Sequence, residues 1–229
     1  MDVPRELFGH ERNFKNFVQH IPNTVQCSRE REQRVLRNQD EKQEYLKIII
    51  DGATIPVSTI WDALALFYTN NIGKPPESLT SLDQQTRWVI QHLNQLARWI
   101  SIFEPEVVET IRNRHLVQPN TTAVAWKLEG HRIMKISFGT SLIGEHSVRE
   151  RLIKFRQKVD SEIHRLFPQD ANGRLLKSLT FWPFESCAET TTLFHLVSWR
   201  RGLPIRTYAI QTASQEMMSP CANCQLIIP

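Results

Sequence analysis

One stretch decides the fold of the second half of the chain: TTAVAWKLEGHRIMKISF, residues 121–138. Its first part is rich in β-branched and aromatic residues, and its second part alternates, with Met134, Ile136 and Phe138 on one side. Both patterns are typical of strands. Gly130 lies between the two parts, where a glycine supplies the backbone freedom of a short turn. The stretch therefore predicts a β-hairpin.

The residues after the hairpin predict a mixture of helix and strand. A charged segment over residues 147–167 favours a helix, as does the segment over 190–200. The segment over 205–211 is typical of a strand. Residues 119–229 are therefore expected to form an α/β domain.

The residues before the hairpin read as helical. A short apolar helix is predicted over residues 59–68. A second helix carries an apolar stripe at helical spacing, formed by Val89, Leu93, Leu96, Ile100 and Phe103. Pro105 is expected to open the next helix, because proline suits the first helical turn. We therefore expect an all-α N-terminal region, residues 1–118.

Composition places the chain among ordinary globular proteins. It has 229 residues, 41% of them hydrophobic and 23% charged, with a formal net charge of +4. No apolar run approaches the ~18 residues that a membrane helix needs, and the residues from Met1 to Glu6 do not resemble a signal peptide. We expect an intracellular protein, cytoplasmic or nuclear, that is not secreted and has no membrane partner.

The C-terminal motif is Pro220-Cys221-Ala222-Asn223-Cys224. Proline suits the first turn of a helix, and residues three apart share a helix face, so the two thiols can bind one metal ion. The same motif is also compatible with a redox pair or with two buried structural cysteines. Cys27 is interpreted as a plain thiol.

An upstream motif, Cys187-Ala188-Glu189, favours the metal interpretation. At a helix start, Cys187 can supply a third thiolate while Glu189 reaches over the same site, because the first residue has non-helical dihedrals. Three protein ligands with one open position suit a catalytic Zn²⁺. A carboxylate that is not a ligand can then move protons.

Together the two motifs resemble the signature H/C-x-E…P-C-x-x-C of zinc-dependent deaminases of the cytidine deaminase superfamily, in a divergent branch of fungal or bacterial-toxin type. The predicted order of strand, strand, helix, strand and helix is similar to that fold. The resemblance implies an incomplete three-layer deaminase-like core over residues 119–229, truncated at the C-terminus. It implies a hydrolytic deaminase in which Cys187, Cys221 and Cys224 bind Zn²⁺, zinc-bound hydroxide adds to the base, and Glu189 shuttles protons.

The expected substrate contains a nucleobase, as a nucleoside, a nucleotide or a nucleic acid. Thr190 and Gln225 stand where deaminases of free nucleosides usually have arginine, which disfavours free cytidine. The alternative hypothesis is an inactive, truncated deaminase-like protein that binds protein partners through residues 1–118.

Overall fold

The computed structural model describes residues 46–50, 53–57, 60–110, 119–141, 169–172, 176, 179–180, 184–193, 196 and 202–227. Cys27 and the helix predicted over 147–167 lie outside these residues. So does most of the second half of the helix predicted over 190–200. None of the described helices has the length and apolar character needed to cross a membrane.

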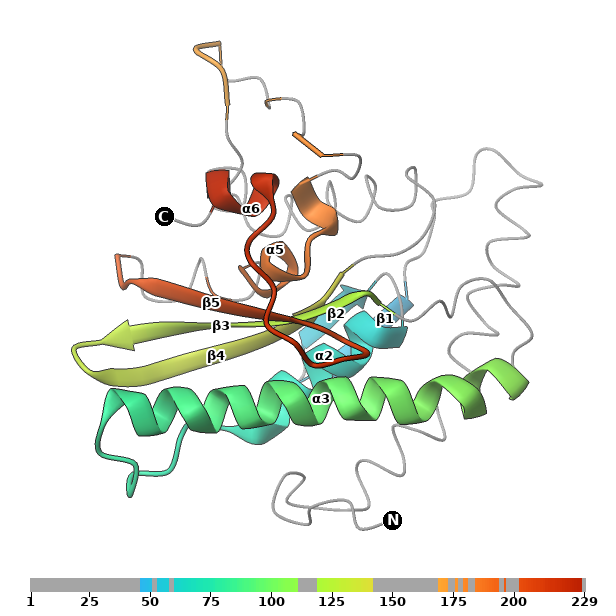
Figure 1. Ribbon diagram of the computed structural model, residues 1–229, viewed down its shortest axis with the longest axis horizontal. Coiled ribbons are helices and arrows are strands. Elements are labelled where there is room, and N and C mark those ends of the chain that lie inside the picture. The colour runs from blue at the N-terminus through green and yellow to red at the C-terminus, as the bar shows by residue number, and fades with distance from the viewer. Residues whose placement is uncertain are drawn as a thin grey trace.

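The described residues combine helices with two antiparallel sheets, which confirms a mixed α/β chain (Figure 1). The first sheet pairs β1 (Leu46–Ile50) with β2 (Ala53–Val57), and the second has the order β4-β3-β5. The strands of the second sheet are β3 (Thr121–Glu129), β4 (Arg132–Thr140) and β5 (Ile205–Gln211). The helices are α2 (Ile60–Ile72), α3 (Leu82–Thr110), α5 (Ala188–Leu193) and α6 (Ala222–Ile227), and a 3₁₀ turn, η3, covers Phe184–Ser186.

The predicted hairpin and the predicted C-terminal strand are confirmed. β3 and β4 pair from Thr122↔Thr140 to Glu129↔Arg132, and Gly130 in their turn has φ +59°, a conformation that favours glycine. β5 pairs along the other side of β3. The central strand of this sheet is therefore β3, which forms the first part of the stretch over residues 121–138.

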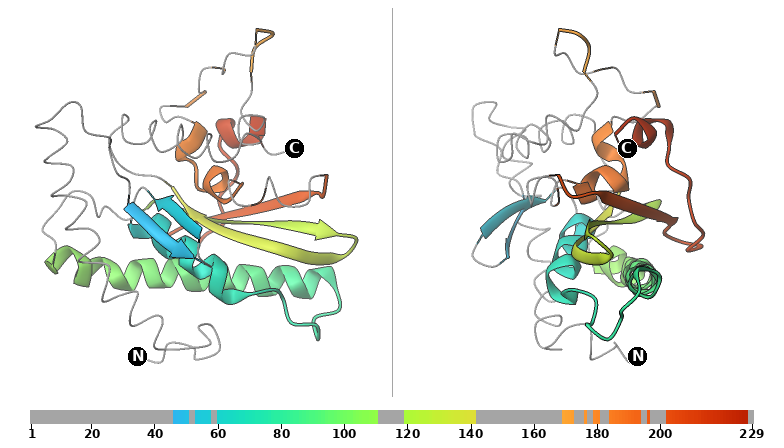
Figure 2. Two further views of the ribbon diagram at one scale, coloured as in Figure 1. Left: turned by 180° about the vertical axis from the view of Figure 1, so that it is seen from behind. Right: turned by 90° about the vertical axis from the view of Figure 1, so that its left-hand side faces the viewer.

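Helices lie on both faces of the three-stranded sheet (Figures 1 and 2). α2 and α3 cover one face and share an apolar core with Val124, Trp126 and Phe138. Four residues of the predicted stripe are fully buried there: Val89, Leu93, Leu96 and Ile100. α5 and α6 lie over the opposite face, so the two cysteine motifs and the main apolar core are on different sides of the sheet.

Side chains from α2 and α3 bind the outer edge of β4. Thr69 on α2 accepts a 2.8 Å hydrogen bond from the backbone N–H of Phe138. Gln85 on α3 accepts one of the same length from the backbone N–H of Ile133. An edge strand exposes unpaired backbone groups, and these two bonds satisfy part of that edge.

The prediction that Pro105 opens a new helix is wrong. α3 continues through this residue to Thr110. A proline inside a helix has no N–H to donate to the carbonyl four residues earlier, here that of Ser101. The helix tolerates this loss because its preceding turns are anchored in the core by the buried stripe.

The expectation of an entirely helical N-terminal region is also corrected. β1 and β2 form a hairpin in which Ile50 pairs with Ala53. The sequence carries a signal for it, because Asp51-Gly52 separates a run of isoleucines from another β-branched segment. Residues 1–45 lie outside the part of the chain that the structure describes.

Candidate metal centre

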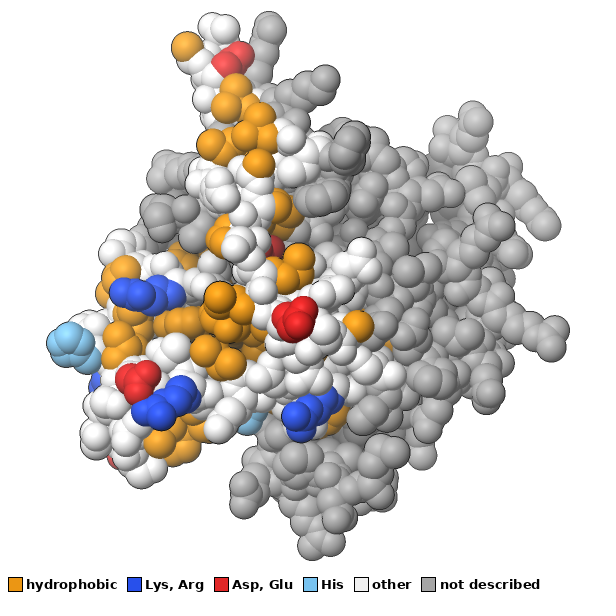
Figure 3. Space-filling model, in the orientation of Figure 1, with side chains coloured by type: hydrophobic (Ala, Val, Ile, Leu, Met, Phe, Trp, Pro, Cys, Tyr) orange, Lys and Arg blue, Asp and Glu red, His pale blue; other side chains and the backbone are white. Residues whose placement is uncertain are grey.

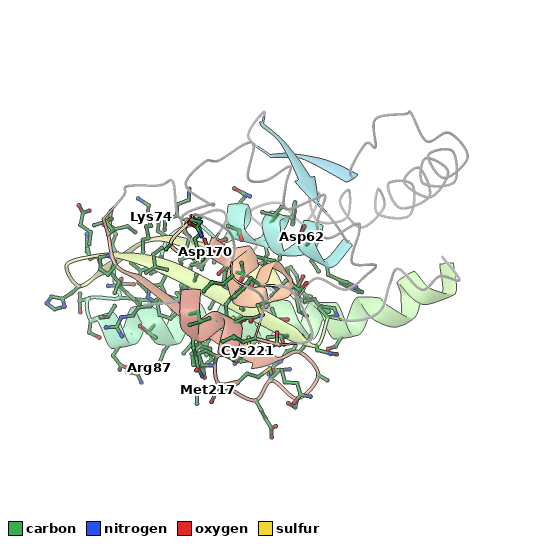
Figure 4. All side chains as sticks on the ribbon, turned by 90° about the horizontal axis from the view of Figure 1, so that it is seen from above. Asp62, Lys74, Arg87, Asp170, Met217 and Cys221 are labelled. Carbon is green, nitrogen blue, oxygen red and sulfur yellow. The ribbon has the colours of Figure 1, made fainter. Side chains whose placement is uncertain are left out.

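Two of the predicted ligands cap the two short helices over the sheet. The carbonyl of Cys187 accepts a 3.1 Å hydrogen bond from the N–H of Thr191, the first bond of α5. The carbonyl of Cys221 accepts a 3.0 Å bond from the N–H of Gln225 in the same way for α6. Figure 4 labels Cys221 at the start of α6. Each cysteine therefore occupies the N-cap position, with its side chain outside the regular helix.

The three predicted cysteine ligands come together in space. The sulfur atoms of Cys187, Cys221 and Cys224 all lie within 4.8 Å of one another, and those of Cys187 and Cys221 are 3.4 Å apart. In a tetrahedral site with Zn–S bonds of about 2.3 Å, neighbouring sulfurs are roughly 3.8 Å apart. The donor atoms and their spacing fit a metal ion such as Zn²⁺.

Without a cation, this crowding favours the protonated thiols. Burial raises the pKa of Cys221, although a hydrogen bond from the backbone N–H of Cys224 to its sulfur opposes the shift. The pKa of Cys224 is raised by its hydrogen bond with the Cys187 side chain, then by burial and by the charge of Glu189. A bound cation stabilises thiolates, so metal binding at this cluster releases protons.

Glu189 lies beside the cluster without belonging to it. It is in the first turn of α5 and only 7% exposed. The charge of its carboxylate raises the pKa of the Cys224 thiol. The structure thus places a buried acidic side chain two residues after the first of the three cysteines, and its role in proton transfer stays a prediction.

Small residues let α5 approach the sheet closely. Ala188 packs against Ala123 and Ala209 of the two adjacent strands. At Gly139 of β4, a Cβ atom would overlap the hydroxyl of Thr191 and lie 3.0 Å from the carbonyl oxygen of Ala188. The height of Cys187 above the sheet is therefore fixed by residues that carry little or no side chain.

Sequence reasoning missed Asn223, the fourth residue of the C-terminal motif. Its side chain is fully buried, and its Oδ1 accepts a 2.9 Å hydrogen bond from the N–H of Leu179. Its Nδ2 donates a 2.8 Å bond to the hydroxyl of Thr180. The residue between the two C-terminal ligands thus holds the segment that leads toward Cys187.

Two buried hydroxyls flank the upstream motif. The side-chain oxygens of Ser186 and Thr190 are buried and have no hydrogen-bond partner. Thr191 and Thr192, by contrast, donate to carbonyls three residues earlier, at 2.7 and 2.6 Å. A buried hydroxyl without a partner costs stability, so the two residues that flank the motif differ in this respect from Thr191 and Thr192.

Comparison of the chain with protein-family models, with curated proteins and with solved structures found no match. The candidate function therefore depends on the chemistry of the cluster and the elements that carry it.

Proposed function

We propose that this chain is a zinc-dependent hydrolytic deaminase of a nucleobase-containing substrate. Cys187, Cys221 and Cys224 hold the ion, and Glu189 moves the protons. One observation carries the proposal: three sulfurs lie within 4.8 Å of one another, and the residue two positions after the first of them is a buried glutamate. This arrangement leaves one position of a tetrahedral metal open.

Each residue has a definite task in this reaction. The zinc ion, when bound, supplies a Lewis acid that lowers the pKa of water. Glu189 accepts the proton that the attacking water loses and returns it to the departing amino group, which leaves as ammonia. The low exposure of Glu189 shields these transfers from bulk solvent.

The order of the elements supports the deaminase-like interpretation of residues 119–229. A hairpin precedes the first motif, α5 begins at that motif, β5 follows, and α6 begins at the second motif. In the face that Figure 3 shows, the described Lys and Arg side chains stand apart from one another. The proposed substrate class is that of nucleobase-containing molecules, as a nucleoside, a nucleotide or a nucleic acid.

The first test is the zinc content of the purified protein. The proposal predicts one zinc per chain in the parent and its loss in both Cys187→Ala and Cys221→Ala, because each variant removes one of three ligands. Gln225→Ala, at an exposed position of α6, is the control and is expected to keep its zinc. Absence of zinc from the parent after supplementation would overturn the proposal.

The second test is deamination. Parent, Glu189→Gln and the exposed control Glu216→Ala are screened for ammonia release from nucleosides, nucleotides and short oligonucleotides. We expect turnover by the parent and the control, and none by Glu189→Gln with its zinc retained. Full zinc loading without turnover of any substrate would instead favour the inactive alternative, in which residues 1–118 bind protein partners.

A further inference from the structure

The contact between the two helix-capping cysteines carries a second kind of chemistry. The sulfur atoms of Cys187 and Cys221 lie 3.4 Å apart, although 34 positions separate the two residues. A disulfide bond is about 2.05 Å long, so the two sulfurs must approach by roughly 1.4 Å to form one. The fold has thus brought two distant cysteines close to bonding distance.

The three thiols differ in their access to solvent. Cys221 is partly exposed, whereas Cys187 is 6% exposed and Cys224 is fully buried. A small oxidant from solvent therefore meets the sulfur of Cys221 first. Cys187 is then in place to react with the oxidised sulfur.

We propose that Cys187 and Cys221 form a redox pair that a peroxide oxidises to a disulfide when no metal is bound. The disulfide and the metal exclude each other, because the bond consumes two of the three ligands. The inference rests on the cysteine cluster of the proposed function, and the disulfide would regulate metal binding at that site. It does not depend on deamination.

The reaction takes place in two balanced steps. The thiol of Cys221 gives up its proton and its sulfur attacks the peroxide, the O–O bond breaks, and the leaving hydroxide takes that proton, so a sulfenic acid and one molecule of water form from hydrogen peroxide. The sulfur of Cys187 then attacks the sulfenic sulfur, the S–O bond breaks, and a second water leaves with the thiol proton. Two thiols are oxidised by two electrons, and one peroxide is reduced.

This pairing differs from the redox interpretation of the C-terminal motif alone, which predicts a bond between Cys221 and Cys224. The two disulfides give oxidised proteins that can be told apart. A bond between Cys187 and Cys221 links α5 to α6, whereas a bond within the motif leaves the two helices unconnected.

The test uses the full chain with Cys27→Ser, so that only the three clustered thiols remain. The protein is stripped of metal with a chelator, treated with hydrogen peroxide and digested with trypsin without reduction. Cys187 falls in the peptide 178–200, and the other two cysteines share the peptide 207–229. We expect these two peptides to be cross-linked, with the loss of two of the three thiols.

Two further variants assign the bond. Cys224→Ser keeps the cross-link, and Cys221→Ser loses it. Zinc added before the peroxide lowers the cross-linked fraction by more than about tenfold, because the bound form withholds the sulfurs. A bond confined to the peptide 207–229, a cross-link that survives in Cys221→Ser, or no protection by zinc would each overturn the inference.

The outcomes also separate this inference from the proposed function. Cross-linking with zinc protection but without deamination would support the redox pair and contradict the proposed enzymatic activity. Deamination without the cross-link would support the enzymatic activity and contradict the redox pair.

Discussion

The side-chain amide of Asn223 donates a 2.8 Å hydrogen bond to the hydroxyl of Thr180, 43 residues earlier in the chain. With the bond that it accepts from the N–H of Leu179, this contact ties α6 to the segment that precedes the first cysteine ligand. A residue between two cysteines thereby helps to position the third.

Asn223→Ala is expected to weaken zinc binding by about tenfold or more, as the loss of a group that orients metal ligands typically does. The measurement is competition for zinc with a chelator of known affinity. Gln225→Ala removes a bond from the same helix to the carbonyl of Pro220 and should leave the affinity unchanged. Equal affinities for the two variants would assign Asn223 no part in positioning the ligands.

Gly139→Ala is expected to lower the free energy of unfolding by about 1–3 kcal/mol, because the new methyl group overlaps Thr191 and crowds the carbonyl of Ala188. Urea denaturation measures the effect. In a Thr191→Ala background the overlapping hydroxyl is gone, so the same substitution should cost less there. An equal cost in both backgrounds would show that the close approach of α5 does not depend on this contact.

His92 predicts a pH dependence of stability. Burial lowers its pKa to about 4 in the folded chain, while an unfolded histidine titrates near 6.5. As the pH falls from about 6.5 to 4, the unfolded chain binds the proton and the folded chain does not, so the free energy of unfolding decreases. Below the folded pKa the loss stops growing.

The measurement is chemical denaturation of the metal-free protein at several pH values in this window. His92→Gln should flatten the decrease relative to the parent, and His131→Gln, at an exposed position in the β3–β4 turn, should not. Parallel curves for the parent and His92→Gln would contradict the assignment.

Pro105→Ala distinguishes a continuous α3 from two helices that meet at this residue. In a continuous helix the substitution restores a hydrogen bond to the carbonyl of Ser101, and we expect stability to rise by about 1–3 kcal/mol. At the start of a separate helix, proline is favoured and its replacement would be neutral or harmful. Thermal unfolding of the two proteins gives the sign of the effect.

The elements that the sequence predicted correctly are those whose signal is local. The hairpin at Gly130, the strand over 205–211 and the buried stripe of α3 all follow from periodicity and turn chemistry within a few residues. Pro105 misled the prediction because tertiary packing outweighed a local preference. The β1–β2 hairpin was missed although Asp51-Gly52, between two β-branched segments, is a sequence typical of a hairpin turn.

The candidate site divides in the same way. Cysteine spacing and the neighbouring glutamate mark the candidate ligands, and the sequence therefore anticipated that Cys187 would meet Cys221. Asn223 could not be found, since its partners at residues 179 and 180 have no fixed distance from it along the chain and one of them is a backbone group. The same applies to Gly139, whose importance depends on which helix happens to cross it.

The helices on the two faces of the three-stranded sheet differ in length and in the apolar core behind them. α2 and α3 have 13 and 29 residues and a continuous apolar core behind them, whereas α5 and α6 have six residues each. Helices that short do not persist on their own in water. The molecule thus has one side whose long helices are held by an extensive apolar core, and another side whose short helices depend on close packing against the sheet through small residues.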